Sequence, residues 1–232
     1  MLEDLKQKVY EANMLLYKHN LVIFTWGNVS GKSDDGKYIA IKPSGVAYEI
    51  LKPQDIVILD TEGNIVEGNL NPSSDTPTHI ELYRAFPKVK GICHTHSNYA
   101  TSFAQAGKTI DAFGTTQADY FYGNIPCTRC LTQEETENDY EKNTGKVIAQ
   151  TFLNLDYMAI PGVLVKQHGV FTWGNTAYNA VHNAIVMEEL AKMNYQTIQL
   201  NAGDNKLPQY TLNKHYNRKH GKNAYYGQKQ GV

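Results

Sequence analysis

The segment Gly91-Ile92-Cys93-His94-Thr95-His96 has the composition of a short β-strand, and it ends with two histidines. Side chains at positions i and i+2 of a strand project from the same face of a sheet, so the two imidazoles point the same way. Two imidazoles on one face can converge on one metal ion. For this motif alone a second interpretation stays open, in which both histidines face solvent at a strand end.

A second predicted strand, residues 162–168, also ends with a histidine, His168, which Gly169 follows. If the two strands lie near one another, His168 joins His94 and His96 in a set of three nitrogen ligands. Three such ligands with an open fourth position are typical of catalytic zinc, whereas Mg²⁺ and Ca²⁺ prefer oxygen. Asp75 lies in a polar loop before a predicted helix. It is a fourth ligand, an acid/base group or simply a helix N-cap.

Hydrophobic periodicity on either side of these strands predicts a single α/β domain over residues 1–232, with no repeats or long linkers. Thr132 and Glu135 form a capping box at the start of the longest central helix. The other predicted strands cover residues 21–25, 38–42, 56–60, 65–66 and 170–173. The predicted helices cover residues 2–18, 77–85, a stretch ending at 106, 131–154, 175–195 and 212–227.

The composition excludes several classes of protein. Of the 232 residues 41% are hydrophobic and 19% are charged, which is typical of a globular chain and not of a disordered one. The net charge of −1 gives no electrostatic reason to expect a nucleic-acid or membrane partner. No apolar stretch is long enough to span a membrane, and residues 1–8 lack the apolar core of a signal peptide.

Three cysteines, an odd number, predict a reducing, cytoplasmic location. The Cys127–Cys130 pair lacks further zinc ligands nearby and is interpreted as incidental.

Three short loops combine small residues with hydrogen-bond donors. Glycine lets backbone N–H groups approach an anion, serine hydroxyls donate, and Lys42 supplies positive charge. None of the loops matches a nucleotide-binding pattern, and each alone is also an ordinary turn. Together they predict a small phosphorylated ligand. The loops are Gly27-Asn28, Lys42-Pro43-Ser44-Gly45 and Ser73-Ser74.

Several separated motifs, taken in order and spacing, resemble the class II aldolase/adducin family, and the resemblance covers nearly the whole chain. Residues 114–116, 118–123 and 219–228 narrow it to the branch that epimerises L-ribulose 5-phosphate at C4. The family motifs are Thr25-Trp26-Gly27-Asn28-Val29-Ser30, Lys42-Pro43-Ser44-Gly45, Pro72-Ser73-Ser74-Asp75-Thr76-Pro77-Thr78-His79, His94-Thr95-His96-Ser97, and the stretches 161–169 and 173–174.

The resemblance implies a central, mainly antiparallel sheet flanked by helices. It implies a homotetramer with fourfold symmetry and active sites at subunit interfaces, in which segment 212–228 completes a neighbouring site. It also implies the roles of particular residues. Zinc, one ion per subunit, is expected on His94, His96 and His168 with Asp75 close by. Phosphate contacts are expected from Gly27, Asn28, Ser44, Gly45, Ser73 and Ser74, with Lys42 near. Asp119 and Tyr226 match the acid/base pair that comes from a neighbouring subunit. Glu141, His215 and Arg218 also fall at matching positions.

The implied reaction inverts C4 of L-ribulose 5-phosphate and gives D-xylulose 5-phosphate. The proton on C4 is not adjacent to the C2 carbonyl and is not acidic, so cleavage and re-formation of the C3–C4 bond is the better route. An aldolase that releases its products from a ketose phosphate is one alternative. A non-catalytic adducin-like binding module, which has this fold without the metal site, is another. In related aldolases the position of Asp75 is Glu, and we hypothesise that the shorter side chain favours recombination of the fragments.

Overall fold

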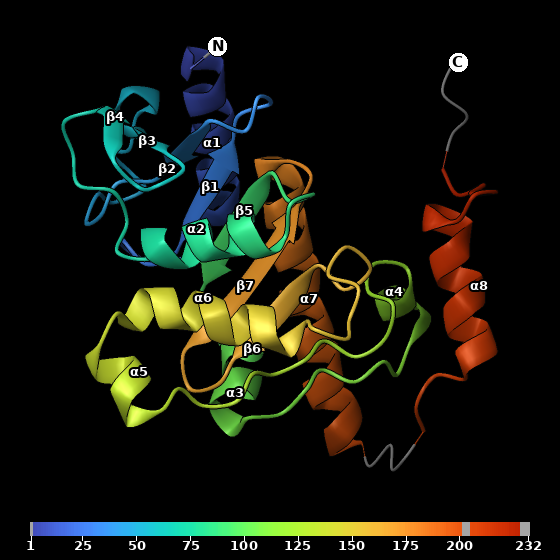
Figure 1. Cartoon of the computed structure of the whole chain (residues 1–232). Helices are drawn as coiled ribbons and strands as arrows, with labels where there is room; N and C mark the ends of the chain where they lie inside the picture. Colours follow the sequence, from blue (N-terminus) through green and yellow to red (C-terminus); the bar gives the residue numbers. More distant parts are fainter. Residues whose placement is uncertain (1, 201–204, 228–232) are drawn as a thin grey trace.

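The computed structural model describes residues 2–200 and 205–227 (Figure 1). Gln228, the last residue of the predicted segment 212–228, lies outside them. Within the described residues seven strands form one sheet in the order β4-β3-β2-β1-β5-β7-β6, with antiparallel neighbours throughout. The strands are β1 (Asn28–Lys32), β2 (Tyr38–Ile41), β3 (Val57–Asp60), β4 (Ile65–Glu67), β5 (Gly91–Thr95), β6 (Gly162–Val165) and β7 (Gly169–Gly174).

Helices cover the sheet and extend beyond it (Figure 1). A short 3₁₀ turn, Pro53–Asp55, precedes β3. The helices are α1 (Leu2–Lys18), α2 (Thr76–Ala85), α3 (Asn98–Ala106), α4 (Thr115–Ala118), α5 (Gln133–Glu137), α6 (Tyr140–Thr151), α7 (Ala177–Gln199) and α8 (Gln209–His220).

The core has two parts, one on each face of the sheet. Successive side chains of a strand point to opposite faces, and the buried residues of β5 follow this rule. Ile92 packs in the cluster that contains side chains of α2, α3 and α6, whereas Cys93 packs in the cluster formed with α1 and part of α7. His94, two residues beyond Ile92, therefore projects toward the α2 and α6 side, where α2 and α6 run side by side (Figure 1).

Several predictions are confirmed to within one residue: the helix at 2–18, the strands at 38–42, 56–60, 65–66 and 91–96, and the capping box of Thr132 and Glu135. The strand predicted at 21–25 is wrong. Phe24 has φ 56°, a left-handed conformation that no strand contains, and this segment is an irregular loop. The strand begins instead at Asn28. Its Gly31 lets α1 approach closely, because a Cβ there would lie 2.7 Å from Val9 Cγ2.

The single helix predicted at 131–154 is also wrong. It is divided into α5 and α6 by Asn138 and Asp139, and Asp139 has φ 54°. The strand predicted at 162–168 ends at Val165. Residues 166–168 form a tight turn in which Gln167 has φ 62°, so His168 lies in the turn between β6 and β7. The predicted helices at 175–195 and 212–227 correspond to α7 and α8 with shifted ends.

None of the helices in the described part of the chain combines the length and the apolar character needed to cross a membrane.

Candidate functional site

Three histidines from two neighbouring strand ends converge beside the start of α2. One ring nitrogen from each of His94, His96 and His168 lies within 4.8 Å of the other two. His94 and His96 bring their Nε2 atoms to 3.0 Å from each other. The i and i+2 spacing produces this convergence as predicted, while antiparallel pairing of β5 with β7 brings His168 alongside. His94 is buried, so the solvent-facing interpretation is wrong for it.

Backbone contacts and electrostatics favour the neutral, metal-binding form of the rings. His94 Nδ1 lies 2.9 Å from the carbonyl oxygen of Val170, so Nδ1–H donates to it and Nε2 stays free as a ligand atom. Burial, and then the proximity of the other imidazoles, lowers the pKa of His96 to about 4 and that of His168 to about 3. Neutral imidazoles at neutral pH are the form that metal binding requires.

Asp75 occupies the N-cap position of α2, but its side chain makes no capping hydrogen bond. Instead Asn28 Nδ2 donates to Asp75 Oδ2 over 2.7 Å, and the same oxygen lies 3.9 Å from His94 Nε2. Burial alone would raise the pKa of Asp75. The adjacent His94 and His79 and the bond from Asn28 outweigh burial, and the net shift is downward. A simple N-cap role is therefore wrong, and Asp75 presents a carboxylate to the three histidines.

This donor set fits zinc. Zinc–nitrogen bonds of about 2.0–2.1 Å place tetrahedral ligand atoms roughly 3.3 Å apart. The Nε2 atoms of His94 and His96 are 3.0 Å apart, and the ligand nitrogen of His168 lies within 4.8 Å of the other two. Imidazole nitrogen with one carboxylate nearby is a donor set typical of this ion, and Mg²⁺ or Ca²⁺ would require more oxygen ligands. Cys127 and Cys130 are not part of this group.

The three predicted phosphate loops lie next to one another. Pro43 pairs with Pro72 in an isolated bridge, and Ser73 N–H donates to Lys42 O over 3.1 Å, which joins the second loop to the third. Asn28 Nδ2 donates to Ser73 Oγ over 3.0 Å and joins the first loop to the third. Gly27, with φ 73°, approaches β5 so closely that a Cβ would lie 2.8 Å from His94 O.

Lys42 is almost fully buried among these loops. Its Nζ donates to Val46 O over 2.6 Å and lies 4.8 Å from the ring centroid of Tyr48. The Tyr48 hydroxyl donates to Gly27 O over 2.9 Å. Burial lowers the pKa of Lys42 to about 8, so at neutral pH it still carries a charge that shapes the loops.

The loops and histidines enclose one pocket of about 500 Å³. This volume fits a small ligand, and the pocket has basic, hydroxyl and imidazole groups on its walls. Glu141, one of the predicted residues, lines it together with Tyr140, which the sequence patterns did not indicate. The predicted residues that line it are Gly27, Asn28, Lys42, Ser44, Gly45, Ser73, Ser74, Asp75, His94, His96, Glu141 and His168.

The remaining predicted residues form a second cluster, where α8 meets the loop after α4. Both oxygens of Asp119 accept hydrogen bonds from Arg218, and His215 Nδ1 lies 3.2 Å from Asp119 Oδ1. The Tyr226 ring lies against Arg218, 4.9 Å from the guanidinium carbon. Burial would raise the pKa of Asp119, but the bonds from Arg218 and His215 outweigh burial and lower it.

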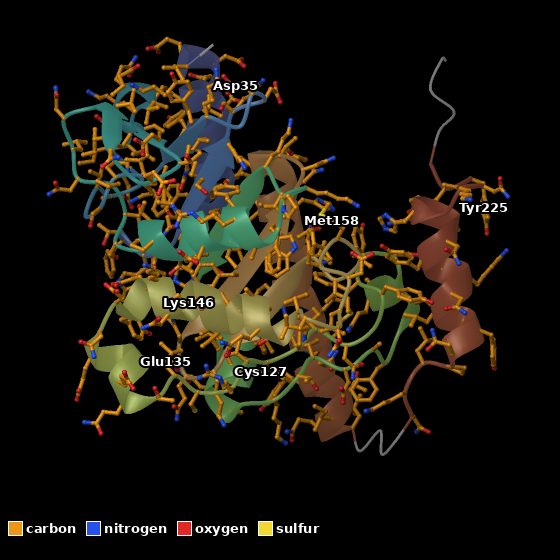
Figure 2. The ribbon with its side chains drawn as sticks, viewed as in Figure 1. Asp35, Cys127, Glu135, Lys146, Met158 and Tyr225 are labelled. Carbon is orange, nitrogen blue, oxygen red and sulfur yellow. The ribbon has the colours of Figure 1, made fainter. Side chains whose placement is uncertain are left out.

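The second cluster lies apart from the pocket. None of its four residues lines the pocket. Figure 1 shows α8 at the right of the view, with α6, whose first two residues line the pocket, to its left. Figure 2 shows Tyr225 beside α8 and Lys146 on α6, on different sides of the molecule. The structure thus brings the predicted site residues together in two groups.

A buried polar chain behind the pocket was missed by sequence reasoning. His79 is fully buried, and its Nδ1 lies 2.7 Å from Ser30 Oγ, which lies 2.8 Å from the Tyr83 hydroxyl. His79 lies in the helix predicted at 77–85, where a packing or surface role is expected, and the structure shows that it packs in the interior. Its spacing of four residues from Asp75, one helical turn, is the signal that could have associated it with the site.

Comparison with known proteins identifies the fold. The Class II Aldolase and Adducin N-terminal domain matches residues 7–195. A solved L-fuculose 1-phosphate aldolase superposes with a TM-score of 0.75 at 25% identity, covering 93% of this chain and 95% of that one. The corresponding enzyme from Glaciozyma antarctica gives 0.73 at 18% identity, covering 93% and 81%. The enzyme from Thermus thermophilus gives 0.67 at 21% identity, covering 88% and 100%.

Proposed function

This chain belongs to the class II aldolase and adducin family, and we propose that it acts as a zinc-dependent L-ribulose-5-phosphate 4-epimerase. Members of the family are generally enzymes. The observation that carries the proposal is the convergence of His94, His96 and His168 on the wall of a pocket built from three phosphate-type loops. A non-catalytic adducin-like module would have no need of these three ligands.

The loops would hold the phosphate group. Ser44 and Ser73 offer hydroxyls, and Lys42 contributes positive charge from behind. The space beside Gly45 is open, because a Cβ placed there would have no atom within 4 Å, so an anion can approach its backbone. Held in this way, the two-carbon aldehyde fragment cannot leave the pocket while it turns. This retention distinguishes an epimerase from an aldolase.

A bound zinc ion would supply Lewis-acid stabilisation of the negative charge that develops on the sugar oxygens. The chain's own residues would move the protons. One group removes the proton of the C4 hydroxyl, the C3–C4 bond breaks, and its electron pair remains on the three-carbon fragment as an enediolate. After the aldehyde rotates, the same bond forms on the other face and a second group returns a proton to the new alkoxide.

Asp119 and Tyr226 are the proposed acid/base pair. Asp119 keeps a carboxylate that can accept a proton, and Tyr226 offers a phenolic one. Their distance from the pocket within one subunit supports a site shared between neighbouring subunits of a homotetramer, with segment 212–228 completing the next site. His215 and Arg218 would orient Asp119. Glu141, on the pocket wall, would contact substrate.

An aldolase that releases its products is the second candidate, because L-fuculose 1-phosphate aldolases are among the structures that this chain resembles. A role in arabinose breakdown, or in the use of ascorbate-derived pentuloses, follows from the epimerase proposal, as does a cytoplasmic location.

One assay separates the candidates. Zinc-loaded protein is incubated with L-ribulose 5-phosphate or with L-fuculose 1-phosphate, and D-xylulose 5-phosphate and free aldehyde are quantified. The proposal expects xylulose phosphate from the first substrate with little free aldehyde from either. Dominant aldehyde release would favour the aldolase.

The His96→Asn variant should lose zinc and activity together, and the His19→Asn variant, changed at the end of α1, should keep both.

A further inference from the structure

Tyr140 occupies a special position on the pocket wall. It is the first residue of α6, and it follows Asp139, whose φ of 54° divides the helix predicted at 131–154. Left-handed backbone at a non-glycine residue costs free energy and is often retained at functional sites. Here the division directs Tyr140 and Glu141 into the pocket with the three histidines.

The start of α6 is held firmly against α2, the helix that begins beside Asp75. Thr78 Oγ1 donates to Glu141 O over 2.6 Å. Gly145 lies so close to α2 that a Cβ there would be 2.6 Å from Glu81 Cβ. Tyr140 is therefore fixed relative to the histidines by tight packing between two helices.

The phenol of Tyr140 meets one of the proposed ligands. Its hydroxyl oxygen lies 3.5 Å from His168 Nδ1, and the two ring centroids are 6.0 Å apart. If His168 offers Nε2 to the metal, as His94 does, Nδ1 carries the proton and Tyr140 must be the acceptor. The single proton of the phenol then points away from His168 and toward the pocket.

We propose that Tyr140 is a dual contact in this site, accepting a hydrogen bond from His168 Nδ1–H and donating its own to an oxygen of the bound sugar phosphate. The first contact orients a metal ligand. The second rests on the proposed function.

Zinc affinity tests the first contact without any turnover. Wild-type protein, Tyr140→Phe, Tyr140→Leu and a control, Tyr178→Phe on the exposed face of α7, compete for zinc with a chromophoric chelator. Loss of a hydrogen-bonding partner of a ligating histidine weakens zinc by about tenfold or more, so Tyr140→Phe should show that loss and the control none. Wild-type affinity in Tyr140→Phe would overturn the contact. If Tyr140→Leu alone were weakened, packing of the ring would be the explanation.

Steady-state kinetics at saturating zinc test the second contact. The Tyr140→Phe variant loses one hydrogen bond to bound substrate. Its KM for L-ribulose 5-phosphate should rise by about tenfold, with kcat little changed. Inhibition by inorganic phosphate, which the loops would bind, should not change. An unaltered KM would overturn the sugar contact. Absence of turnover in the wild-type protein would overturn the proposed function and the sugar contact with it, while the zinc titration would still decide the contact with His168.

Discussion

Asp75 connects the two parts of the pocket at the scale of single residues. Its carboxylate accepts a hydrogen bond from Asn28 in the first loop and lies 3.9 Å from His94 Nε2. A side chain of this length can reach toward the three histidines without reaching far into the pocket.

The Asp75→Glu substitution should convert part of the epimerase activity into cleavage. The additional methylene brings the carboxyl group close to the enediolate. After taking up a proton from solvent, the carboxyl group can pass that proton to the enediolate carbon, so the fragments separate before the bond re-forms. The measurement is free dihydroxyacetone released per xylulose 5-phosphate formed, with zinc content checked in parallel. Asp111→Glu, outside the pocket, is the control. Our hypothesis for Asp75 would be abandoned if a zinc-loaded Asp75→Glu variant released no more dihydroxyacetone than the wild-type protein.

Lys42 should give the protein's stability a characteristic dependence on pH. Burial lowers its pKa from 10.5 to about 8, so between these values the unfolded chain holds more protons than the folded one. The free energy of unfolding therefore increases with pH across this window, whereas below pH 8 the full cost of burying the ammonium remains. Denaturant unfolding of wild type and Lys42→Met, from about pH 7 to about pH 10.5, should show their difference shifting in favour of wild type as pH rises. Parallel curves would contradict this explanation.

At the scale of helices and strands, a few polar bonds attach α8 to the rest of the subunit. Leu212 is its buried residue, and the contacts centre on Asp119 with Arg218 and His215. His220 Nε2 also donates to the backbone oxygen of Asp119 over 2.9 Å.

Asp119→Asn should loosen α8 while leaving the sheet intact. The substitution removes the negative charge to which Arg218 and His215 both bond, so charge-assisted hydrogen bonds become weaker neutral ones. Amide hydrogen exchange in α8 should therefore become faster, by about tenfold or more. Amides of α7 should stay protected. Unchanged exchange in α8 would show that other contacts hold it.

Local sequence patterns predicted most elements because periodicity and capping signals are strong in them. They failed where tertiary contacts override propensity. Residues 21–25 are β-branched and aromatic but form a loop, while β1 contains Gly31, whose missing side chain lets α1 pack closely. The division at Asp139 likewise follows from the packing of α6 on α2, and no local pattern indicated it.

The part of the site that depends on local spacing was predictable from the sequence, and the part that depends on tertiary contacts was not. The strand spacing of His94 and His96 is a local signal, so their convergence could be expected. Tyr140 enters the pocket only because a helix is divided beside it, and His79 lies behind the pocket only because α2 packs against β1 and β7. These contacts depend on the whole fold.

At the scale of the whole molecule, the net charge of −1 means that no global field attracts a phosphorylated substrate. Binding of an anion must come from the three loops and Lys42. In the proposed homotetramer, the acid/base pair of the second cluster would act on the pocket of a neighbouring subunit.

Mixing two inactive variants should restore activity. A His96→Asn subunit has a defective pocket but an intact Tyr226. A Tyr226→Phe subunit has an intact pocket but lacks the phenol that would serve the neighbouring pocket. In randomly mixed homotetramers with shared sites, roughly a quarter of the sites would contain two intact halves. Unfolding and refolding the variants together should recover activity near that fraction, and refolding them separately should not. No recovery from proven mixed tetramers would place the whole site within one subunit.

If the C3–C4 bond breaks and re-forms within one pocket, the hydrogen on C4 never leaves that carbon, and NMR of the products formed in D₂O reports its fate. Zinc-loaded protein acting on L-ribulose 5-phosphate should give D-xylulose 5-phosphate that retains hydrogen at C4, with no accumulation of glycolaldehyde phosphate. Deuterium at C4, free fragments as the main products, or no epimer at all would contradict the account.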